Sequence, residues 1–171
     1  ALKSALKAGV EELGGRLDIV IANAGIAPLA GEDAWQDVID VNLTGVYNTL
    51  DVSTRPMVKA GNGGSIINIS SSGSLRPDAY MLPYAAAKAG LNTLTEGFAK
   101  AFGPTVRVNT LMAGPFLTDI SKAWGEDTSN AFRSLPLQRA GEPREIIGAA
   151  LFLMSDASSF TTGSILRADG G

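Results

Sequence analysis

The hydrophobic positions along the chain follow a helical period in some segments and form short continuous runs in others. Apolar residues from Leu2 to Leu13 recur at helical spacing, and Gly14-Gly15 predicts the end of that helix. Further helices are predicted over residues 33–60, 82–102 and about 143–154, and residues 116–140 predict an irregular, partly helical insertion. Short apolar runs predict strands at residues 17–22, 65–70, 106–111 and about 164–168.

The order of these elements predicts the fold class. The first run lacks strict polar alternation, which is typical of a strand buried on both faces of a parallel sheet. Alternating strands and helices predict one α/β domain over residues 1–171, with right-handed crossovers. Four strands are fewer than a complete doubly wound sheet contains. We therefore expect a Rossmann-like doubly wound parallel sheet that lacks its N-terminal strands.

The beginning of the chain agrees with that expectation. The sequence opens within a helical pattern and without a methionine, so we expect an N-terminal truncation or an N-terminal part that the structure leaves out. No stretch reaches the roughly 18 apolar residues of a membrane span, and no apolar block of a signal peptide precedes Gly14. We expect a cytoplasmic protein without membrane contact.

The composition narrows the chemistry. The chain has no histidine and no cysteine, which excludes disulfides, Ser–His and Cys–His nucleophiles, and zinc sites built on those residues. We predict no metal site. The net charge is −3 and no cluster of Lys and Arg stands out, so nucleic-acid binding is not expected. Acid–base catalysis near neutral pH therefore falls to Tyr, Lys, Asp or Glu.

Tyr84 and Lys88 are the candidate acid–base pair. Of the three tyrosines, only Tyr84 has a lysine four residues later, and this spacing places both side chains on one helix face. A phenol with an ordinary pKa of about 10 must become much more acidic to act as a base at neutral pH, and a nearby ammonium favours that change. The alternative is an amphipathic helix with a packed tyrosine and an exposed lysine.

Three polar segments accompany this pair. Ser70-Ser71-Ser72-Gly73 follows a predicted buried strand at the end where open α/β sheets bind ligands. Asn42 interrupts an apolar helical stretch, and it could equally satisfy a backbone carbonyl or take part in chemistry. Asn23-Ala24-Gly25 ends the first strand, where Gly25 permits close approach of the backbone to a ligand.

Taken in order, the motifs resemble the short-chain dehydrogenase/reductase family. They are Asn23-Ala24-Gly25, Asn42-Leu43-Thr44-Gly45, Ile69-Ser70-Ser71, the Tyr84-to-Lys88 spacing, Val108-Asn109-Thr110, Gly114 to Thr118, and the closing Asp169-Gly170-Gly171. The resemblance covers essentially the whole chain. It implies NAD or NADP as cofactor and a small alcohol or ketone as substrate.

The resemblance also implies roles for individual residues. Because the family's catalytic serine precedes its tyrosine by thirteen residues, it selects Ser71 over Ser70 and Ser72. The implied catalytic set is Asn42, Ser71, Tyr84 and Lys88, in which Asn42 holds a water through its backbone. Tyr84 and Lys88 also belong to the implied cofactor site, whose other members are Asn23, Ala24, Gly25, Ala113, Gly114, Phe116 and Thr118.

Two departures from the family pattern concern the cofactor. The family has Pro-Gly where this chain has Ala113-Gly114, followed by Pro115. The Gly-rich turn that normally holds the pyrophosphate is missing from these residues, as is the residue that separates NAD from NADP. The resemblance places Ala1 about seventy to eighty residues into a typical family member.

The remaining expectations concern substrate, assembly and function. Phe116, Leu117, Trp124 and Phe132 lie where the family has its substrate lid, with core packing as the alternative. Arg76, Tyr80, Met81 and Leu82 are expected to line an apolar pocket. Small residues at Ala86, Gly90 and Gly97 fit either a homodimer or homotetramer interface, as the family implies, or packing on the chain's own sheet. The expected activity is alcohol–ketone interconversion. The alternatives are a 3-oxoacyl-thioester reductase and a non-catalytic fragment that serves as an oligomerising scaffold.

Overall fold

The computed structural model describes residues 1–27, 34–124, 130 and 132–171. Within these residues, four strands form one parallel sheet in the order β1-β2-β3-β4. The strands are β1 (Ile19–Ala22), β2 (Gly64–Ser71), β3 (Val106–Ala113) and β4 (Ile165–Ala168). The predicted parallel α/β sheet is thereby confirmed.

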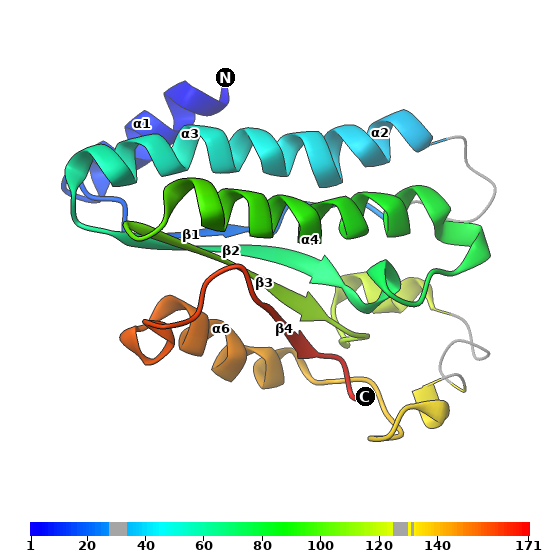
Figure 1. Cartoon of the computed structure of the whole chain (residues 1–171). Helices are drawn as coiled ribbons and strands as arrows, with labels where there is room; N and C mark the ends of the chain where they lie inside the picture. The colour runs from blue at the N-terminus through cyan, green and yellow to red at the C-terminus, as the bar shows by residue number, and fades with distance from the viewer. Residues whose placement is uncertain (28–33, 125–129, 131) are drawn as a thin grey trace.

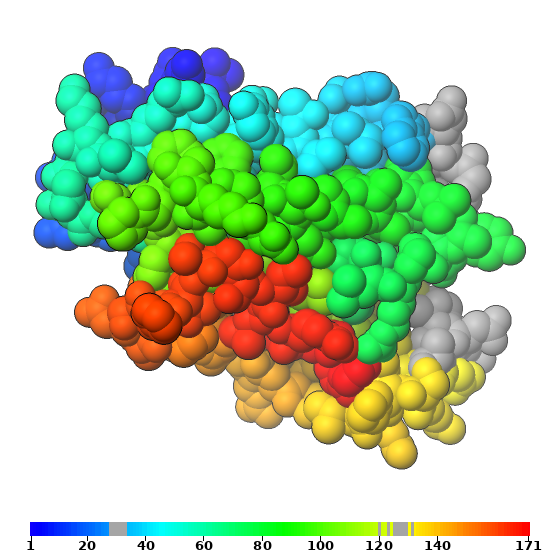
Figure 2. Space-filling model, viewed as in Figure 1, coloured from blue at the N-terminus to red at the C-terminus, as the bar shows by residue number. Residues whose placement is uncertain are grey.

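Helices cover both faces of this sheet. Figure 1 shows α1 (Leu2–Glu12), α2 (Trp35–Ile39), α3 (Gly45–Ala60) and α4 (Leu82–Phe102) on one side, with α6 (Ile147–Met154) on the other. The space-filling view shows α3 and α4 running side by side across one face of the molecule (Figure 2). Single turns of 3₁₀ or π-helix complete the path: η1 (Asp40–Thr44), η2 (Ser72–Ser74), η3 (Ala79–Met81), η4 (Asp119–Ala123), η5 (Phe132–Ser134), η6 (Pro143–Ile146) and η7 (Asp156–Ser158).

Successive side chains of β2 enter two separate cores. Ile66 packs with Leu50 of α3 and Leu91 of α4, whereas Ile67 faces the opposite way and packs with Leu153 of α6. All of these residues are fully buried, as expected for a strand sandwiched between two helix layers. The prediction that residues 65–70 form a buried strand is therefore confirmed.

The hand of one crossover differs from the prediction. The connections through α3 and α4 lie on one face of the sheet and the connection through α6 lies on the other, although the strands are all parallel and their order never reverses. The α6 connection must therefore have the opposite hand to the other two, so uniform right-handed crossovers are wrong here. Because the chain runs through residues 114–142 before η6 begins, this connection is not the direct strand–helix–strand unit that the rule describes.

The first strand is also less buried than predicted. Ile19 and Ile21 are 43% and 46% exposed, so the expectation that residues 17–22 are buried on both faces is wrong. In the described part of the chain, β1 pairs with β2 alone and forms an edge of the sheet. Its other face, with Val20 and Ala22, packs into the core beneath α3.

The predicted helix 33–60 contains an irregularity. Residue 33 lies outside the described residues, and the helical path begins at Trp35. It passes through the π-helical turn η1, in which Asn42 is fully buried, before α3 continues to Ala60. Gly61, with a φ of 71°, ends α3 in the left-handed conformation that glycine tolerates best. No helix in the described residues is long and apolar enough to cross a membrane.

Candidate active site

The carboxyl ends of β1, β2 and β3 surround a cavity of about 190 Å³. Open α/β sheets bind their ligands at this edge. The cavity brings together five residues from distant parts of the sequence that the motifs had singled out: Asn23, Gly25, Ser71, Tyr84 and Lys88. It also brings in Ala113 and Gly114, and its remaining lining residues are Ile26, Ala27, Ile69 and Ser70.

Lys88 is buried beside this cavity. Lys88 is only 4% exposed, which contradicts the alternative of a solvent-exposed lysine. Nζ donates a hydrogen bond to the Ile69 carbonyl at 2.8 Å and lies 5.6 Å from the centroid of the Tyr84 ring. Burial disfavours the charged form and lowers the pKa of Lys88 to about 8.

Tyr84 lies on the same face of α4, one helical turn before Lys88. Burial raises the pKa of its phenol, and a hydrogen bond with Ser71 lowers the pKa by a smaller amount, so the net pKa lies above the ordinary value. The expectation that Lys88 makes the Tyr84 phenol more acidic is not met by the chain alone. The reason is physical: desolvation of the phenolate outweighs its stabilisation by the neighbouring groups.

The structure separates the roles of the neighbouring serines. The Ser70 hydroxyl is buried and donates to the Lys88 carbonyl at 3.1 Å. The Ser71 hydroxyl is shared between Tyr84 and the Gly73 N–H, which donates to Ser71 Oγ at 3.1 Å. Ser71 is therefore the hydroxyl that meets the phenol, as the thirteen-residue spacing implied.

Asn42 holds the loop that follows β1. Its Nδ2 donates to the Ile26 carbonyl at 2.8 Å and to the Val38 carbonyl at 3.1 Å, and its Oδ1 accepts from the Ile26 N–H at 3.1 Å. A Cβ on Gly25 would lie only 2.6 Å from Asn42 Oδ1. The side chain thus does satisfy backbone groups, and glycine is required where the loop crosses it.

Gly114 meets a similar requirement at the end of β3. A Cβ there would lie 2.5 Å from Asp169 Cα, so this loop and the chain after β4 are in backbone contact. Ala24, Phe116 and Thr118 do not line the cavity beside Tyr84. Phe116 instead pairs with Gly141 and lines a second cavity, of about 250 Å³, that includes Gly170.

Comparisons with known proteins agree with this arrangement. A family model for enoyl-(acyl carrier protein) reductases within the short-chain dehydrogenases matches residues 1–171. The chain belongs to the short-chain dehydrogenase/reductase family. A 3-oxoacyl-[acyl-carrier-protein] reductase of Chlamydia trachomatis is 41% identical over 162 residues, which are 91% of this chain and 65% of that protein. The chain thus spans about two thirds of the length of this curated relative.

Two other proteins to which the chain is similar are named after sorbose and gluconate. A sorbose reductase of Schizosaccharomyces pombe is 39% identical over 95% of this chain and 67% of its own length. The crystal structure of a gluconate 5-dehydrogenase from Burkholderia cenocepacia, in complex with NADP and tartrate, superposes with a TM-score of 0.92 and is 34% identical. That match covers 99% of this chain and 69% of that one.

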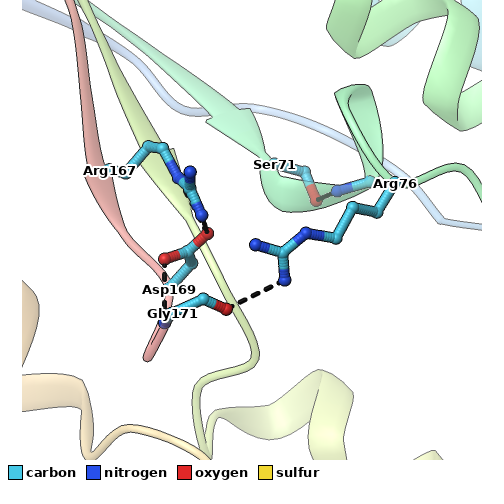
Figure 3. Close-up of polar contacts among 6 residues, drawn as sticks. Ser71, Arg76, Arg167, Asp169 and Gly171 are labelled. Carbon is cyan, nitrogen blue, oxygen red and sulfur yellow. Dashed lines mark hydrogen bonds and ion pairs between the residues drawn. The ribbon is translucent and has the colours of Figure 1, made fainter. Parts of the chain in front are cut away.

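The predicted substrate-pocket residues of this family member lie apart from the cavity. Arg76, Tyr80, Met81 and Leu82 are not among its lining residues, and Tyr80 is 79% exposed. Arg76 extends toward the C-terminal segment, where Nη1 donates to the Gly171 carbonyl at 2.8 Å (Figure 3). These four residues do not line this cavity, since Arg76 reaches Gly171 and both Tyr80 and Leu82 are exposed. Their place in a substrate pocket stays a prediction.

The C-terminal segment holds its own charges. Burial alone would raise the pKa of Asp169, but the hydrogen bond from Arg167, the Gly171 N–H and the charges of Arg167 and Arg76 together lower it. The Arg167–Asp169 contact is an ion pair of 2.8 Å (Figure 3). The charges of Arg167 and Asp169 offset one another at the end of β4.

In the expected lid segment, Trp124 and Phe132 pack edge to face at a centroid distance of 5.0 Å. This contact shows packing within the segment, whose residues 125–129 and 131 lie outside the described part. Whether the segment closes over a substrate stays a prediction.

Sequence reasoning missed three residues that hold the site together. The Ile69 carbonyl accepts from Lys88, the Ser70 hydroxyl binds the Lys88 carbonyl, and Asn92 binds the loop after Ser71. The position of Asn92 could have been predicted from the sequence, because it lies one helical turn after Lys88 on the same helix face. Ile69 acts through its backbone, so its side chain gives no signal.

The residues present fit the ribose and nicotinamide end of a dinucleotide. Among the described residues, Lys88 Nζ donates to one acceptor, the Ile69 carbonyl, and an ammonium has three N–H donors, so donors remain for ribose hydroxyls. Gly25 and Gly114 supply positions where no side chain fits beside the cavity. Among the described residues, no group of three or more Asp or Glu side chains could hold a metal ion.

Proposed function

We propose that the chain carries the catalytic groups of an NAD(P)-dependent oxidoreductase that interconverts a secondary alcohol and a ketone by hydride transfer. One observation carries this proposal: the Lys88 ammonium is buried against Tyr84 at the carboxyl end of a parallel sheet. Within the described residues no carboxylate forms an ion pair with Lys88. Such a burial costs free energy, and proteins concentrate costs of this kind at functional sites.

Each catalytic side chain has a separate task in this mechanism. In the reductive direction, Tyr84 donates its hydroxyl proton to the carbonyl oxygen while the carbonyl carbon receives a hydride. Ser71 donates a hydrogen bond to the same oxygen and orients it. In the oxidative direction the Tyr84 phenolate accepts the alcohol proton. Asn42 keeps the loop at Ile26 in place, and its backbone is the proposed holder of a relay water.

The cofactor-binding residues of this proposal are those that the family resemblance implies. Asn23, Gly25, Ala113 and Gly114 line the cavity, whereas Ala24, Phe116 and Thr118 do not. A bound NAD(H) or NADP(H) supplies or accepts the hydride. Lys88 would bind the ribose next to the nicotinamide, and the segment Asn23-Ala24-Gly25 would flank the adenosine ribose. The nicotinamide end would be contacted by Ala113, Gly114, Phe116 and Thr118.

A 3-oxoacyl-thioester reductase is the second candidate. The Chlamydia relative with 41% identity favours it, and the same four catalytic residues would serve. The sorbose and gluconate relatives favour a free polyhydroxylated substrate instead. Rates with 3-oxoacyl thioesters, ketoses and keto sugar acids, each with NADH and NADPH, would separate these classes.

We also propose that the protein forms a homodimer or homotetramer through the outward face of α4 and its neighbours. Thr93 and Gly97 on this face are exposed, and a Cβ on Gly97 would meet nothing within 4 Å. Trp35, on the adjoining α2, is 53% exposed. Gly90 does not support this interface directly, because a Cβ at this position would lie 3.1 Å from Cδ1 of the chain's own Leu43. The glycine therefore makes room for packing within the chain.

The proposed function is tested by a matched pair of serine variants. In the natural polypeptide that carries these 171 residues, Ser71→Ala is expected to lower carbonyl reduction by at least about 100-fold. Ser72→Ala removes a hydroxyl one residue away and is expected to leave the rate within about twofold. Equal activity of Ser71→Ala and wild type would contradict the proposal. Absence of NADH and NADPH binding by fluorescence titration would favour the non-catalytic scaffold.

A further inference from the structure

Asn92 links the helix that carries Tyr84 and Lys88 to the loop that carries Ser71. It lies on α4 one turn after Lys88 and two turns after Tyr84, on the same face. Its Nδ2 donates to Ser74 Oγ at 3.1 Å. A hydroxyl can donate as well as accept, so this link persists whichever way the amide is oriented.

Burial makes an amide costly at this position. Asn92 is 9% exposed, and its Oδ1 is buried without a hydrogen-bond partner among the described residues. A buried polar atom without a partner costs about 1–3 kcal/mol, which an apolar side chain of similar size would avoid. Core packing alone therefore gives no reason for asparagine here, whereas the hydrogen bond to Ser74 does.

Ser74 is the last residue of the turn that begins directly after Ser71. Within this turn the Gly73 N–H donates to Ser71 Oγ. A Cβ on Gly73 would lie 3.4 Å from Ser71 Oγ and 3.9 Å from Tyr84 Cε1, so the turn covers both catalytic groups. Anchoring Ser74 to α4 therefore fixes the turn over the Ser71–Tyr84 contact.

A second bond on the other side of Ser71 completes the attachment. The Ser70 hydroxyl donates to the Lys88 carbonyl at 3.1 Å, in a fully buried position. Ser71 thus stands between two hydrogen bonds to α4, one from each flank. The bond from Ser70 holds the end of the strand, and the bond from Asn92 holds the far end of the turn.

We propose that Asn92 is a positioning residue, which holds Ser74 and so keeps the Ser71 hydroxyl in contact with the Tyr84 hydroxyl. This inference rests on the proposed function. Asn92 would affect the reaction through Tyr84, because loss of the Ser71–Tyr84 contact removes the hydrogen bond that lowers the pKa of the Tyr84 phenol. Lys88 is the charged group that the structure places against the Tyr84 ring, and Asn92 substitution leaves it in place.

The test uses Asn92→Leu, Ser74→Ala and the double variant in the natural polypeptide. We expect each single variant to lower kcat for carbonyl reduction about tenfold with an unchanged KM for the cofactor. The double variant should be no slower than Asn92→Leu, because both changes remove one link. Ser74→Thr keeps a hydroxyl and should retain the wild-type rate.

A pH profile separates positioning from simple loss of stability. Without the Ser71 contact, the Tyr84 pKa rises further, so the alkaline decline of the reduction rate moves to higher pH in Asn92→Leu. Asn62→Leu makes the same chemical change in an exposed loop and should leave both kcat and the profile unchanged. Should Asn92→Leu fail to fold, Ser74→Ala removes the same hydrogen bond at a half-buried position of the turn and provides the same readout.

The outcomes distinguish this inference from the proposed function. A parallel measurement on Tyr84→Phe tests the proposed function separately. Wild-type turnover that depends on Tyr84, together with unchanged kcat and pH profile in Asn92→Leu and Ser74→Ala, would overturn the positioning role alone. Wild-type protein without turnover would overturn both. Additive losses in the double variant would also contradict a shared link.

Discussion

At the residue scale, burial sets the protonation states of the two central groups in opposite directions. Desolvation raises the pKa of Tyr84 and lowers the pKa of Lys88 to about 8, since both groups are neutral in the form that burial favours. At neutral pH the Tyr84 phenol therefore carries its proton. A protonated phenol can donate to a carbonyl oxygen, and it cannot accept a proton from an alcohol.

These directions predict opposite pH dependences for the two reactions. Reduction should be fast at neutral pH and decline in the alkaline range, as Tyr84 loses the proton that it must donate. Oxidation should rise with pH over the same range because its base is the phenolate. Initial rates in both directions, measured by NAD(P)H absorbance from neutral to alkaline pH, check this. An oxidation rate that falls as pH rises would contradict it.

The site could be predicted from sequence only as far as local spacing reaches. Helical periodicity placed Tyr84 and Lys88 on one face, and α4 has the predicted bounds, Leu82–Phe102. Neither the burial of Lys88 nor the acceptor of its Nζ follows from spacing, because both depend on β2 packing against the helix. The raised Tyr84 pKa was missed for the same reason.

At the element scale, the π-helical turn η1 and the loop after β1 fit together through one side chain. Asn42 is fully buried and hydrogen-bonds both backbone groups of Ile26. The sequence predicted an uninterrupted helix across this turn because its apolar pattern continues through Val41 and Leu43. A π-helical turn changes the backbone hydrogen bonding without a consistent residue signature, and such turns are frequent at functional sites.

This fit predicts an asymmetric response to two Gly→Ala changes. Gly25→Ala places a Cβ 2.6 Å from Asn42 Oδ1 and should lower the free energy of unfolding by roughly 1–3 kcal/mol, as overpacking does. Gly148→Ala adds a Cβ that meets nothing within 4 Å on α6 and should raise it by about 0.5–1 kcal/mol. Urea unfolding measures both. Equal effects of the two substitutions would contradict the close contact.

The strands show where burial could be predicted and where it could not. Residues 65–70 and 106–111 are strands with buried faces because helices of this chain cover them on both sides. The run 17–22 has the same apolar character, yet Ile19 and Ile21 are exposed. An apolar sequence indicates that a strand prefers burial, but the covering element must be supplied elsewhere in the fold.

At the scale of the whole molecule, the proposed oligomer requires the outward face of α4 to be covered by another copy. Thr93→Arg introduces a large charged side chain on that face and should shift the native mass to that of a single chain. Ser4→Arg makes a comparable change on the exposed side of α1 and should leave the assembly intact. Light scattering after size exclusion gives both masses. A monomeric wild type would refute the assembly.

The whole molecule also gathers its candidate catalytic residues at one edge of the sheet. The described sheet presents Asn23, Ser71 and Gly114 at the same edge, and the curated relatives extend beyond the matched region. Family membership follows from residues 1–171 together, whereas the proposed reaction depends on a few side chains at that edge. The most direct test therefore removes one atom from that edge.

That measurement compares Tyr84→Phe with wild type in the natural polypeptide, using carbonyl reduction followed by NAD(P)H absorbance. The account predicts that kcat/KM falls by about 100- to 10,000-fold, because the proton donor is lost. Tyr47→Phe, on α3, removes a hydroxyl remote from the cavity and should keep the wild-type rate. Full activity in Tyr84→Phe would contradict the central claim.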